Sequence, residues 1–351
     1  MKIIYKIILG IIFNFFYGKV KISFIKKKNK SVNIKKINFF SKSFTLYEMD
    51  NARIFTDCNT NVAYISSANE ILPQISFQQN KDRISKVSHN SVLKFGTPKL
   101  KYKISGVVFS LVQGASGNNY WHWLFDLLPK IEILHRNNML KHIDYYYVPN
   151  LNPYVVDTLK VYGINKFQLI NSQKLKHITA KKIIAIENIY FKNGFFQKQF
   201  ENIPKFLIIS LNDRFKEFIS SKKSSKKIFI DRSDSKFKHF QLANNKEIIN
   251  KLKQKNYSIV KLSKLSFFEQ ISLFFNSKMI IGVHGAGFAN LAFCKSRTKV
   301  YEILSEKTKK RNAIKTICKH KKLFHKKVVA KEVMLKDGIK KLFLDVSQIK
   351  I

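Results

Sequence analysis

Short apolar runs and amphipathic stretches alternate along most of the chain, and this pattern predicts its elements and its fold class. In the last third, the apolar runs at 228–230, 257–262 and 279–283 have the length of buried strands. Residues 245–254 and 266–276, which lie between these runs, space their apolar positions as helices do, and the second has a serine at its start. Strands that alternate with helices indicate parallel sheets, so we expect an α/β fold.

The same alternation runs through the first half of the chain. Strand-like runs, among them 62–65 and 104–112, are separated there by asparagine, serine and glycine. The elements expected after them are, in chain order, a helix at 120–136, a strand at 145–148, a helix at 154–162, and strands at 167–170 and 183–186. A further helix is expected from Pro204 to about Phe218, because proline suits the first turn of a helix.

A polar stretch rich in lysine and serine, 220–227, separates the two alternating regions and predicts a domain boundary. We therefore expect one domain over 31–220 and a second over 221–351. The second domain is expected to continue with a strand at 299–304 and a helix near 309–320. Ligands of open parallel sheets bind beyond the carboxyl ends of the strands, so polar residues at these ends are the candidates for a site.

Residues 1–30 form a separate N-terminal segment. Its apolar part, 7–17, is too short to span a bilayer comfortably, it contains Asn14, and no small-x-small cleavage site follows it. Lysines flank it from Lys19 onward. Two interpretations stay open: a helix packed on the protein, or a helix that lies in the interface of an anionic membrane.

The richest candidate site is the glycine turn at 284–287, which follows the expected strand 279–283 and precedes an expected helix at 288–293. Two glycines allow the backbone to approach a ligand closely, because no Cβ intervenes. The N–H groups and the dipole of the new helix would favour an anion. The turn therefore predicts a phosphate or diphosphate ligand, with a purely structural joint between strand and helix as the alternative.

Four further residues bear on this turn. Asn290 stands where the dinucleotide-binding fingerprint has its third glycine, so the match to that motif is incomplete. Glu302, near the end of the next strand, could accept hydrogen bonds from ribose hydroxyls or could be a solvated strand-end carboxylate. Arg232 and Lys236 follow the first strand of the second domain, where they could reach phosphates from the same sheet edge or lie in a solvated loop.

A second candidate site lies at the start of the expected helix 120–136. His122 and Asp126 are four residues apart, so they share one face of a helix. An aspartate can orient an imidazole and stabilise its protonated form, as a general base requires. A helix-surface pair among packed aromatic residues is the alternative.

The charge changes this picture little. The 351 residues carry a net charge of +43, which invites a nucleic-acid or anionic-membrane interpretation. Only seven of the 65 basic residues are arginine, the better ligand for bases and phosphates, and the lysines are spread along the whole chain. Solvated lysine-rich faces are therefore the simpler explanation. Three cysteines without paired spacing indicate neither a disulfide framework nor a zinc site, and a reducing cytoplasm suits them.

Several of these segments together resemble glycosyltransferase family 61. The matching pieces occur in order and are Asn119-Tyr-Trp-His-Trp-Leu-Phe-Asp-Leu-Leu-Pro129, Ile230-Asp-Arg-Ser with Asn244-Asn-Lys-Glu247, Leu265-Ser-Phe-Phe-Glu-Gln270, and Ile281-Gly-Val-His-Gly-Ala-Gly-Phe-Ala-Asn290 with Tyr301-Glu302. The resemblance implies a GT-B architecture, in which two Rossmann-like domains face each other across a cleft. It also implies an inverting transfer of a sugar from a nucleotide donor, usually a UDP-sugar.

The resemblance also assigns roles to residues. It places the donor diphosphate on His284, Gly285, Ala286 and Gly287, with Arg232 beside it, and the ribose on Glu302; Asn290 completes the donor motif. The helix of His122 and Asp126 would face the acceptor, and we favour His122 as the base. No Asp-x-Asp motif occurs in the chain, so we expect catalysis without a metal ion or another cofactor.

We therefore expect a bacterial-type glycosyltransferase of surface polysaccharide or lipopolysaccharide biosynthesis. Its partners would be a nucleotide-sugar donor, a glycan or lipid-linked acceptor and an anionic membrane surface, but no specific nucleic acid. It would work in the cytoplasm, on the inner face of the membrane. Two rival functions are an NAD-dependent oxidoreductase, from the incomplete fingerprint, and a non-enzymatic basic protein that binds nucleic acid or membranes, from the charge.

Overall fold

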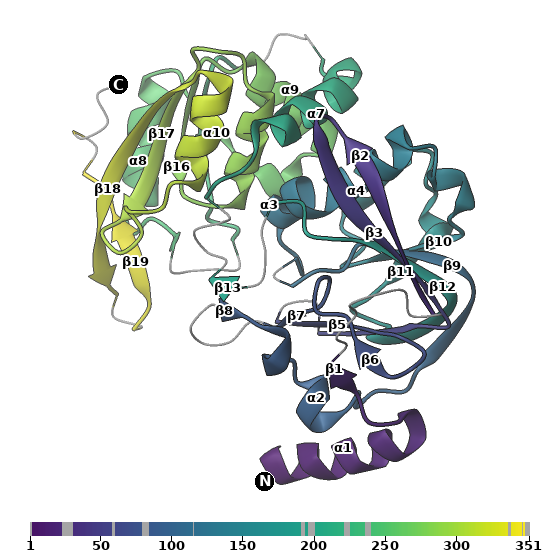
Figure 1. Ribbon diagram of the computed structural model, residues 1–351. Helices are drawn as coiled ribbons and strands as arrows, with labels where there is room; N and C mark the ends of the chain where they lie inside the picture. Colours follow the sequence, from purple (N-terminus) through teal and green to yellow (C-terminus); the bar gives the residue numbers. More distant parts are fainter. Residues whose placement is uncertain are drawn as a thin grey trace. The chain divides into compact units, whose positions relative to one another are not determined.

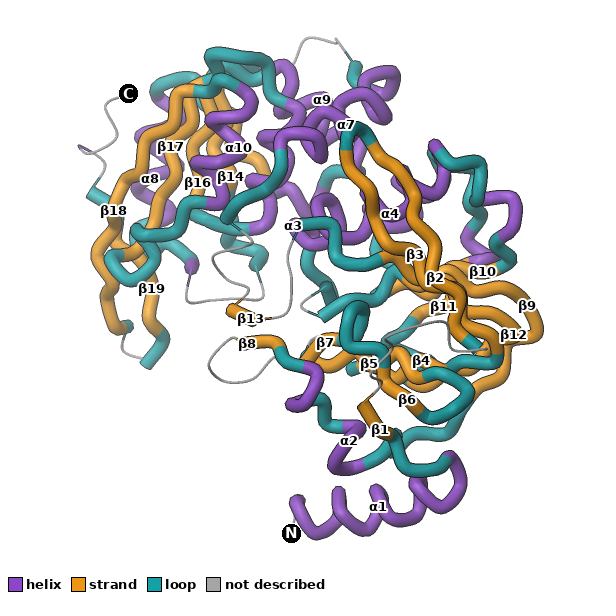
Figure 2. Tube along the Cα trace, in the orientation of Figure 1, coloured by secondary structure: helices purple, strands orange, loops and turns teal. Residues whose placement is uncertain are grey.

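The chain forms two compact units, Met1–Phe200 and Glu201–Ile351 (Figure 1). The computed structural model describes residues 2–22, 31–57, 60–78, 84–114, 116–190, 194–195, 201–220, 225–235, 240–335, 338–345 and 347. Each unit combines a sheet with helices (Figure 2), which confirms the α/β class. Residues 201–220, which the sequence assigned to the first domain, pack with the second unit: the Asn212 amide donates to the carbonyl of Ala292 (2.6 Å).

The C-terminal unit is built on a single sheet. Its strands are β14 (Lys227–Ile230), β15 (Ser258–Val260), β16 (Met279–Val283), β17 (Lys299–Ser305), β18 (Phe324–Met334) and β19 (Lys340–Phe343). They lie side by side in the order β15-β14-β16-β17-β18-β19, and all neighbours are parallel except β18 and β19. The first five strands therefore have the order 2-1-3-4-5 of a doubly wound sheet.

The helices of this unit lie close to the predicted positions. They are α7 (Lys205–Phe215), η5 (Lys216–Phe218), α8 (Asn245–Gln254), η7 (Leu262–Lys264), α9 (Phe267–Asn276), η8 (Ala286–Phe293) and α10 (Ala313–Lys321). Ser266 begins α9 with a capping box, in which its hydroxyl accepts from the N–H of Glu269 and the Glu269 carboxylate accepts from the N–H of Ser266. The helix after the glycine turn is a 3₁₀ helix, and α10 begins at Ala313, later than predicted.

The strand order fixes where this unit has a crevice. The chain leaves β14 toward β15 on one side and leaves β16 toward β17 on the other, so the connections diverge between these two neighbouring strands. Such a switch point leaves a crevice outside the carboxyl ends of the strands, where ligands of doubly wound sheets bind. Arg232 follows β14 and His284 follows β16, so the sheet brings both candidates to this position.

The N-terminal unit has a parallel half that agrees with the prediction. Strands β9 (Tyr102–Ser110), β10 (Tyr145–Val148), β11 (Leu169–Asn171) and β12 (His177–Ile186) lie in the order β12-β9-β10-β11, all parallel. The helices between β9 and β11 are α3 (Tyr120–His122), η2 (Trp123–Leu127), α4 (Leu128–Arg136), η3 (Leu140–His142), α5 (Pro153–Lys160) and η4 (Lys166–Gln168).

The rest of this unit was not predicted in this form. Strands β3 (Lys42–Asp50) and β4 (Arg53–Thr56) pair antiparallel with β12, which makes the sheet mixed. The further strands are β1 (Lys21–Ile22), β2 (Val32–Phe39), β5 (Asn61–Ile65), β6 (Glu70–Ile71) and β7 (Phe77–Gln78), with β8 (Ile84–Ser85) and β13 (Gly194–Phe195) in a separate pair. The β2–β3 hairpin was not predicted, because lysines and asparagines hold four of the five exposed positions of β2 and Ile34 holds the fifth, so apolar and polar positions do not alternate.

Three helices precede the parallel half: α1 (Lys2–Tyr17) and the short η1 (Val87–His89) and α2 (Val92–Phe95). Helix α1 packs on α2 at the margin of the unit (Figure 1). Within the described part of the chain, no helix combines the length and the apolar character that a membrane crossing requires.

Candidate functional site

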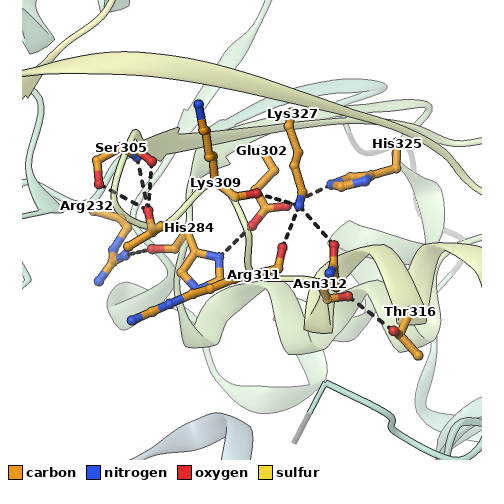
Figure 3. A network of polar contacts seen from close by, with 11 residues as sticks. Arg232, His284, Glu302, Ser305, Lys309, Arg311, Asn312, Thr316, His325 and Lys327 are labelled. Atoms are coloured by element: carbon orange, nitrogen blue, oxygen red, sulfur yellow. Dashed lines mark hydrogen bonds and ion pairs between the residues drawn. The ribbon is translucent and has the colours of Figure 1, made fainter. Parts of the chain in front are cut away.

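Arg232 and the glycine turn meet at the switch point of the C-terminal sheet. The Arg232 guanidinium donates through Nη1 to the main-chain carbonyl of His284 (Figure 3). A Cβ on Gly285 would lie 2.2 Å from that Nη1, so only glycine allows the guanidinium to lie this close to the turn. Asp231 fixes the start of the Arg232 loop, because its Oδ1 accepts from the N–H of Ser233 (2.9 Å) and from the Asn245 amide (3.1 Å).

Two cavities border Arg232. The smaller, of about 130 Å³, lies against Gly285, Gly287 and Leu262. The larger, of about 500 Å³, lies between the ends of β14 and β16 and residues 240–247 at the start of α8. Its volume falls in the range of about 300–1,000 Å³ that is usual for ligand pockets. A cavity of about 640 Å³ beside β15 and α9 includes neither Arg232 nor the turn, so we consider the switch-point cavities the better candidates.

The His284 side chain is held by a buried carboxylate. Its Nδ1 lies 2.5 Å from Oε1 of Glu302, and the second carboxylate oxygen, Oε2, lies 2.8 Å from Nε2 of His325. The Glu302 side chain is 1% exposed. The strand register explains this cluster: Glu302 is paired with Gly282 on β16, and His284 lies two residues beyond Gly282 on the same face of the sheet.

Glu302 is therefore occupied by two imidazoles in the structure. Burial alone would raise the pKa of its carboxyl group, but the hydrogen bonds and charge of His284 and His325 outweigh burial and lower it. The carboxylate is thus the favoured form. By accepting from Nδ1 of His284 it fixes the orientation and the tautomer of that ring.

Two cationic residues that the sequence did not single out complete this network. Arg311 lies with Nη1 3.4 Å from Nε2 of His284. Lys327 donates through Nζ to the carbonyls of Lys309 (2.8 Å) and Arg311 (2.6 Å), which holds the loop before α10 in place (Figure 3). The loop therefore replaces the first helical turn that was predicted at 309–312. The scarcity of arginine was a signal that could have drawn attention to Arg311, because two of only seven arginines lie beside His284.

The remaining predicted residues of this region have other surroundings. Asn290 is buried on the 3₁₀ helix, where its amide donates to Oε1 of Gln270 (2.9 Å), so it ties the turn to α9. Ala286 and Gly287 begin that helix. A Cβ on Gly287 would lie 2.6 Å from Cδ1 of Leu262. Lys236 lies outside the described residues.

The second candidate pair lies in the N-terminal unit, in a helix that changes its winding. The predicted helix 120–136 is present, but its middle turn, η2, is a π-helix, in which the N–H of Leu128 donates to the carbonyl of Trp123. Pro129 has no N–H to donate to the carbonyl four residues before it, which accounts for the wider turn. In this geometry Nδ1 of His122 lies 2.6 Å from Oδ2 of Asp126. Such π-turns are frequent at functional sites.

Asp126 is the centre of a buried polar network. Its side chain is fully buried, and Oδ1 accepts from the hydroxyl of Tyr190 (2.9 Å). The amide of Gln113 lies 3.5 Å from Oδ2. Lys130 is buried nearby and donates to the carbonyl of Ile186 (3.0 Å); burial lowers its pKa to about 8, although the charges of Asp126 and Glu187 oppose the shift. The alternative, a helix-surface pair among packed aromatic residues, therefore does not describe the fully buried Asp126.

Sequence reasoning did not find Tyr190, Gln113 or Lys130. Tyr190 and Gln113 are 64 and 13 positions from Asp126, so no local spacing pointed to them. Lys130 is four residues after Asp126 on the same helix, a spacing that could have drawn attention to it. In the part of the chain that the structure describes, no group of three His, Cys, Asp or Glu side chains is arranged to hold a metal ion. Catalysis without a metal stays a prediction.

Comparison with known proteins identifies one family. Residues 120–301, just over half of the chain, match the family model described as Glycosyltransferase 61. The matched stretch begins at the helix of His122 and ends one residue before Glu302, so Arg311 and His325 lie beyond it. No curated protein matches the chain.

Proposed function

The chain belongs to glycosyltransferase family 61, and from this premise we propose that it moves a sugar from a UDP-sugar to a glycan or lipid-linked acceptor with inversion at the anomeric carbon. The observation that carries the proposal is the meeting of Arg232 with the glycine turn at the switch point. A guanidinium beside Gly285, which has no Cβ, and next to a cavity of about 500 Å³ suits a nucleotide diphosphate.

On the donor side, positive charge stabilises the leaving group. As the bond from the sugar to the diphosphate breaks, negative charge develops on the departing oxygen. Arg232 is held beside the turn and Arg311 beside His284, so both guanidinium groups are placed before the reaction begins. Groups that are already oriented lose little free energy in reorganisation, and for this reason they stabilise the transition state well.

We assign Glu302 a positioning role in place of the ribose contact expected from the sequence. Both of its carboxylate oxygens are engaged by imidazoles, and its side chain is buried. It acts through His284, whose main-chain carbonyl in turn accepts from Arg232. For the nucleoside hydroxyls we propose Glu247, which lines the larger cavity at the first turn of α8. Its oxygens contact Asn244 and Lys251, but its side chain is 49% exposed and so is open to a ligand, unlike that of Glu302.

The N-terminal unit supplies the base in this proposal. With Nδ1 of His122 donating to Asp126, the basic lone pair of the ring is on Nε2. Nε2 takes the proton from the acceptor hydroxyl, and the oxygen of that hydroxyl attacks the anomeric carbon. The bond between the anomeric carbon and the diphosphate oxygen breaks, and the nucleotide diphosphate leaves with its electrons. A single displacement of this kind inverts the anomeric centre and needs one base.

We further propose surface polysaccharide or lipopolysaccharide biosynthesis in a bacterial cytoplasm as the setting. This rests on the resemblance of the sequence motifs to capsule biosynthesis members of the family. The two rival functions lack support. The glycine turn follows the third strand of its sheet, whereas a dinucleotide fingerprint follows the first, and the matched family is one of glycosyltransferases and not of nucleic-acid-binding proteins.

The test is the thermal stability of the purified protein with UDP, GDP, CMP, UDP-sugars and NADH. A ligand that binds only the folded protein raises its melting temperature. At a concentration of 100 times the Kd, it adds about 2.7 kcal/mol to the free energy of unfolding. We expect UDP and UDP-sugars to stabilise the wild type, and Arg232→Ala and His284→Ala to abolish the effect. Stabilisation by NADH alone would support the oxidoreductase instead, and no response to any nucleotide would contradict the donor site.

A further inference from the structure

Helix α1 is oriented with its apolar face outward. The residues on one half of its surface are exposed, and all of them are large and apolar or aromatic. They are Ile4, Tyr5, Ile7, Ile8, Ile11, Ile12, Phe15 and Phe16. Phe15 is 85% exposed and Ile11 is 66% exposed. A surface helix of a globular protein normally buries its apolar stripe and exposes its polar one. An exposed apolar patch of this extent marks an interaction site.

The opposite face of α1 is fitted to the N-terminal unit. Gly10 is buried, and a Cβ there would lie 2.9 Å from the carbonyl oxygen of Phe95 on α2, so the two helices approach closely. At the end of the helix, the carbonyl of Tyr17 accepts from Nη1 of Arg53 (2.9 Å), and the Tyr17 hydroxyl accepts from the N–H of Lys101 (3.1 Å). These contacts lie at the middle and at the end of the helix and hold it against the unit, beside α2 (Figure 1). The exposed apolar residues are therefore on the side that faces away from the unit.

The chain around α1 carries positive charge. Lys19 and Lys21 follow the helix, Lys94 lies on α2 itself, and all three are exposed. Lys101 lies with Nζ 5.1 Å from the centre of the Tyr17 ring. Among the described residues of the outward face itself, none is charged. An apolar face with lysines beside it is the pattern of helices that lie in the interface of an anionic lipid bilayer.

We propose that α1 is an in-plane anchor that docks this protein on an anionic membrane surface. The apolar side chains enter the boundary between headgroups and acyl chains, and the neighbouring lysines contact anionic headgroups. A second copy of the chain is a poorer occupant, because pairing through α1 would bring the same lysines of both copies together, and like charges oppose association. The proposal goes beyond sugar transfer and does not depend on it.

The experiment is flotation of the full chain with vesicles of phosphatidylcholine alone or mixed with phosphatidylglycerol. We expect the wild type to float with the mixed vesicles, less at high salt, and little with phosphatidylcholine alone. The double variant I11E/F15E places two charges on the outward face, and we expect its bound fraction at limiting lipid to fall roughly tenfold or more. Because both side chains are exposed, folding is expected to be unaffected, which circular dichroism and the melting temperature would verify.

The matched control is Phe167→Glu. Phe167 is also in the N-terminal unit and is 81% exposed, but it lies beside β11, at the opposite end of the sheet from β1. F167E should float as the wild type does. Equal flotation of the double variant and the wild type would show that charge alone binds the protein to the vesicles, and it would overturn the proposed anchor. Absence of flotation would overturn it too, as would a dimer that forms through α1 without lipid.

Discussion

Nδ1 of His284 and Oε1 of Glu302 lie 2.5 Å apart, although the two residues come from neighbouring strands of a parallel sheet and are 18 positions apart in the sequence. The contact is a consequence of register, since Gly282 pairs with Glu302, and His284, directly after β16, is the next residue on the face of Gly282. A histidine at the exit of the third strand is thereby fixed by a carboxylate of the fourth. The pairing of the two strands therefore fixes the orientation of the His284 side chain at the start of the turn.

Replacing Glu302 by glutamine is expected to lower kcat/KM roughly 10- to 100-fold, because His284 loses the carboxylate that orients it and small misplacements are costly. The size of the side chain is retained, so the fold should persist. The measurement is sugar transfer by the purified variant. Glu306→Gln is the matched control: this carboxylate is 64% exposed and pairs with Lys309 on the surface, and its loss should leave the rate unchanged.

The same carboxyl group makes the stability dependent on acid. Its pKa is lowered in the folded protein, so its stabilising effect is fully present above the unfolded-state pKa of about 4.3 and is lost as the pH falls through the lower folded-state value. Urea unfolding of the wild type and Glu302→Gln between about pH 3 and pH 6, a range that brackets the unfolded-state pKa, would measure this. We expect their difference in unfolding free energy to shrink toward acid; a constant difference would contradict the lowered pKa.

Gly285→Ala is expected to separate binding from folding. The new Cβ would meet the end of the Arg232 side chain, which can move away at little cost to stability. The guanidinium then leaves the turn, and we expect nucleotide affinity to fall about tenfold or more, equivalent to at least 1.4 kcal/mol. Calorimetric titration with the nucleotide found by thermal stabilisation measures the affinity, and urea unfolding measures stability. A large loss of stability with intact affinity would show that the turn is only a structural joint.

Asp126→Asn tests the base. The variant keeps the shape of the side chain but cannot stabilise a protonated His122, and we expect kcat to fall about 10²- to 10⁴-fold. Tyr190→Phe removes one hydrogen bond to Asp126 and should reduce kcat less. The loss of kcat should therefore be larger for His122→Ala and Asp126→Asn than for Tyr190→Phe, because Tyr190 is further from the transferred proton. Unchanged transfer by His122→Ala would exclude this histidine as the base.

Lys130 gives the stability a second dependence on pH, at the alkaline side. Its folded-state pKa of about 8 lies below the unfolded-state value of about 10.4, so the unfolded chain binds more protons between them and stability rises with pH in that window. Lys130→Met removes this group. The gain from pH 8 to pH 10 should be smaller in the variant than in the wild type, by roughly 3 kcal/mol at most, when both are unfolded in urea. Equal gains in the variant and the wild type would show that the pKa of Lys130 is not lowered in the folded protein.

The sequence alone determined the family and most of the elements of the two parallel regions. The helix at 245–254 and the strand at 279–283 lie where the spacing of apolar residues predicted them, because periodicity reports which face of a segment is buried. The chemistry of the turn at 284–287 was also legible, since glycines, a histidine and a preceding strand are adjacent in the chain.

Only the tertiary structure decided which residues meet. Glu302 contacts His284 and His325 through the register of three strands, Lys327 holds the Arg311 loop, and Tyr190 reaches Asp126 across 64 positions. None of these contacts has a local signal, because side chains from distant segments become neighbours only when strand order and register are fixed. The outward apolar face of α1 is of the same kind. Its composition is visible in the sequence, but which half of the helix is covered depends on the surface against which it packs.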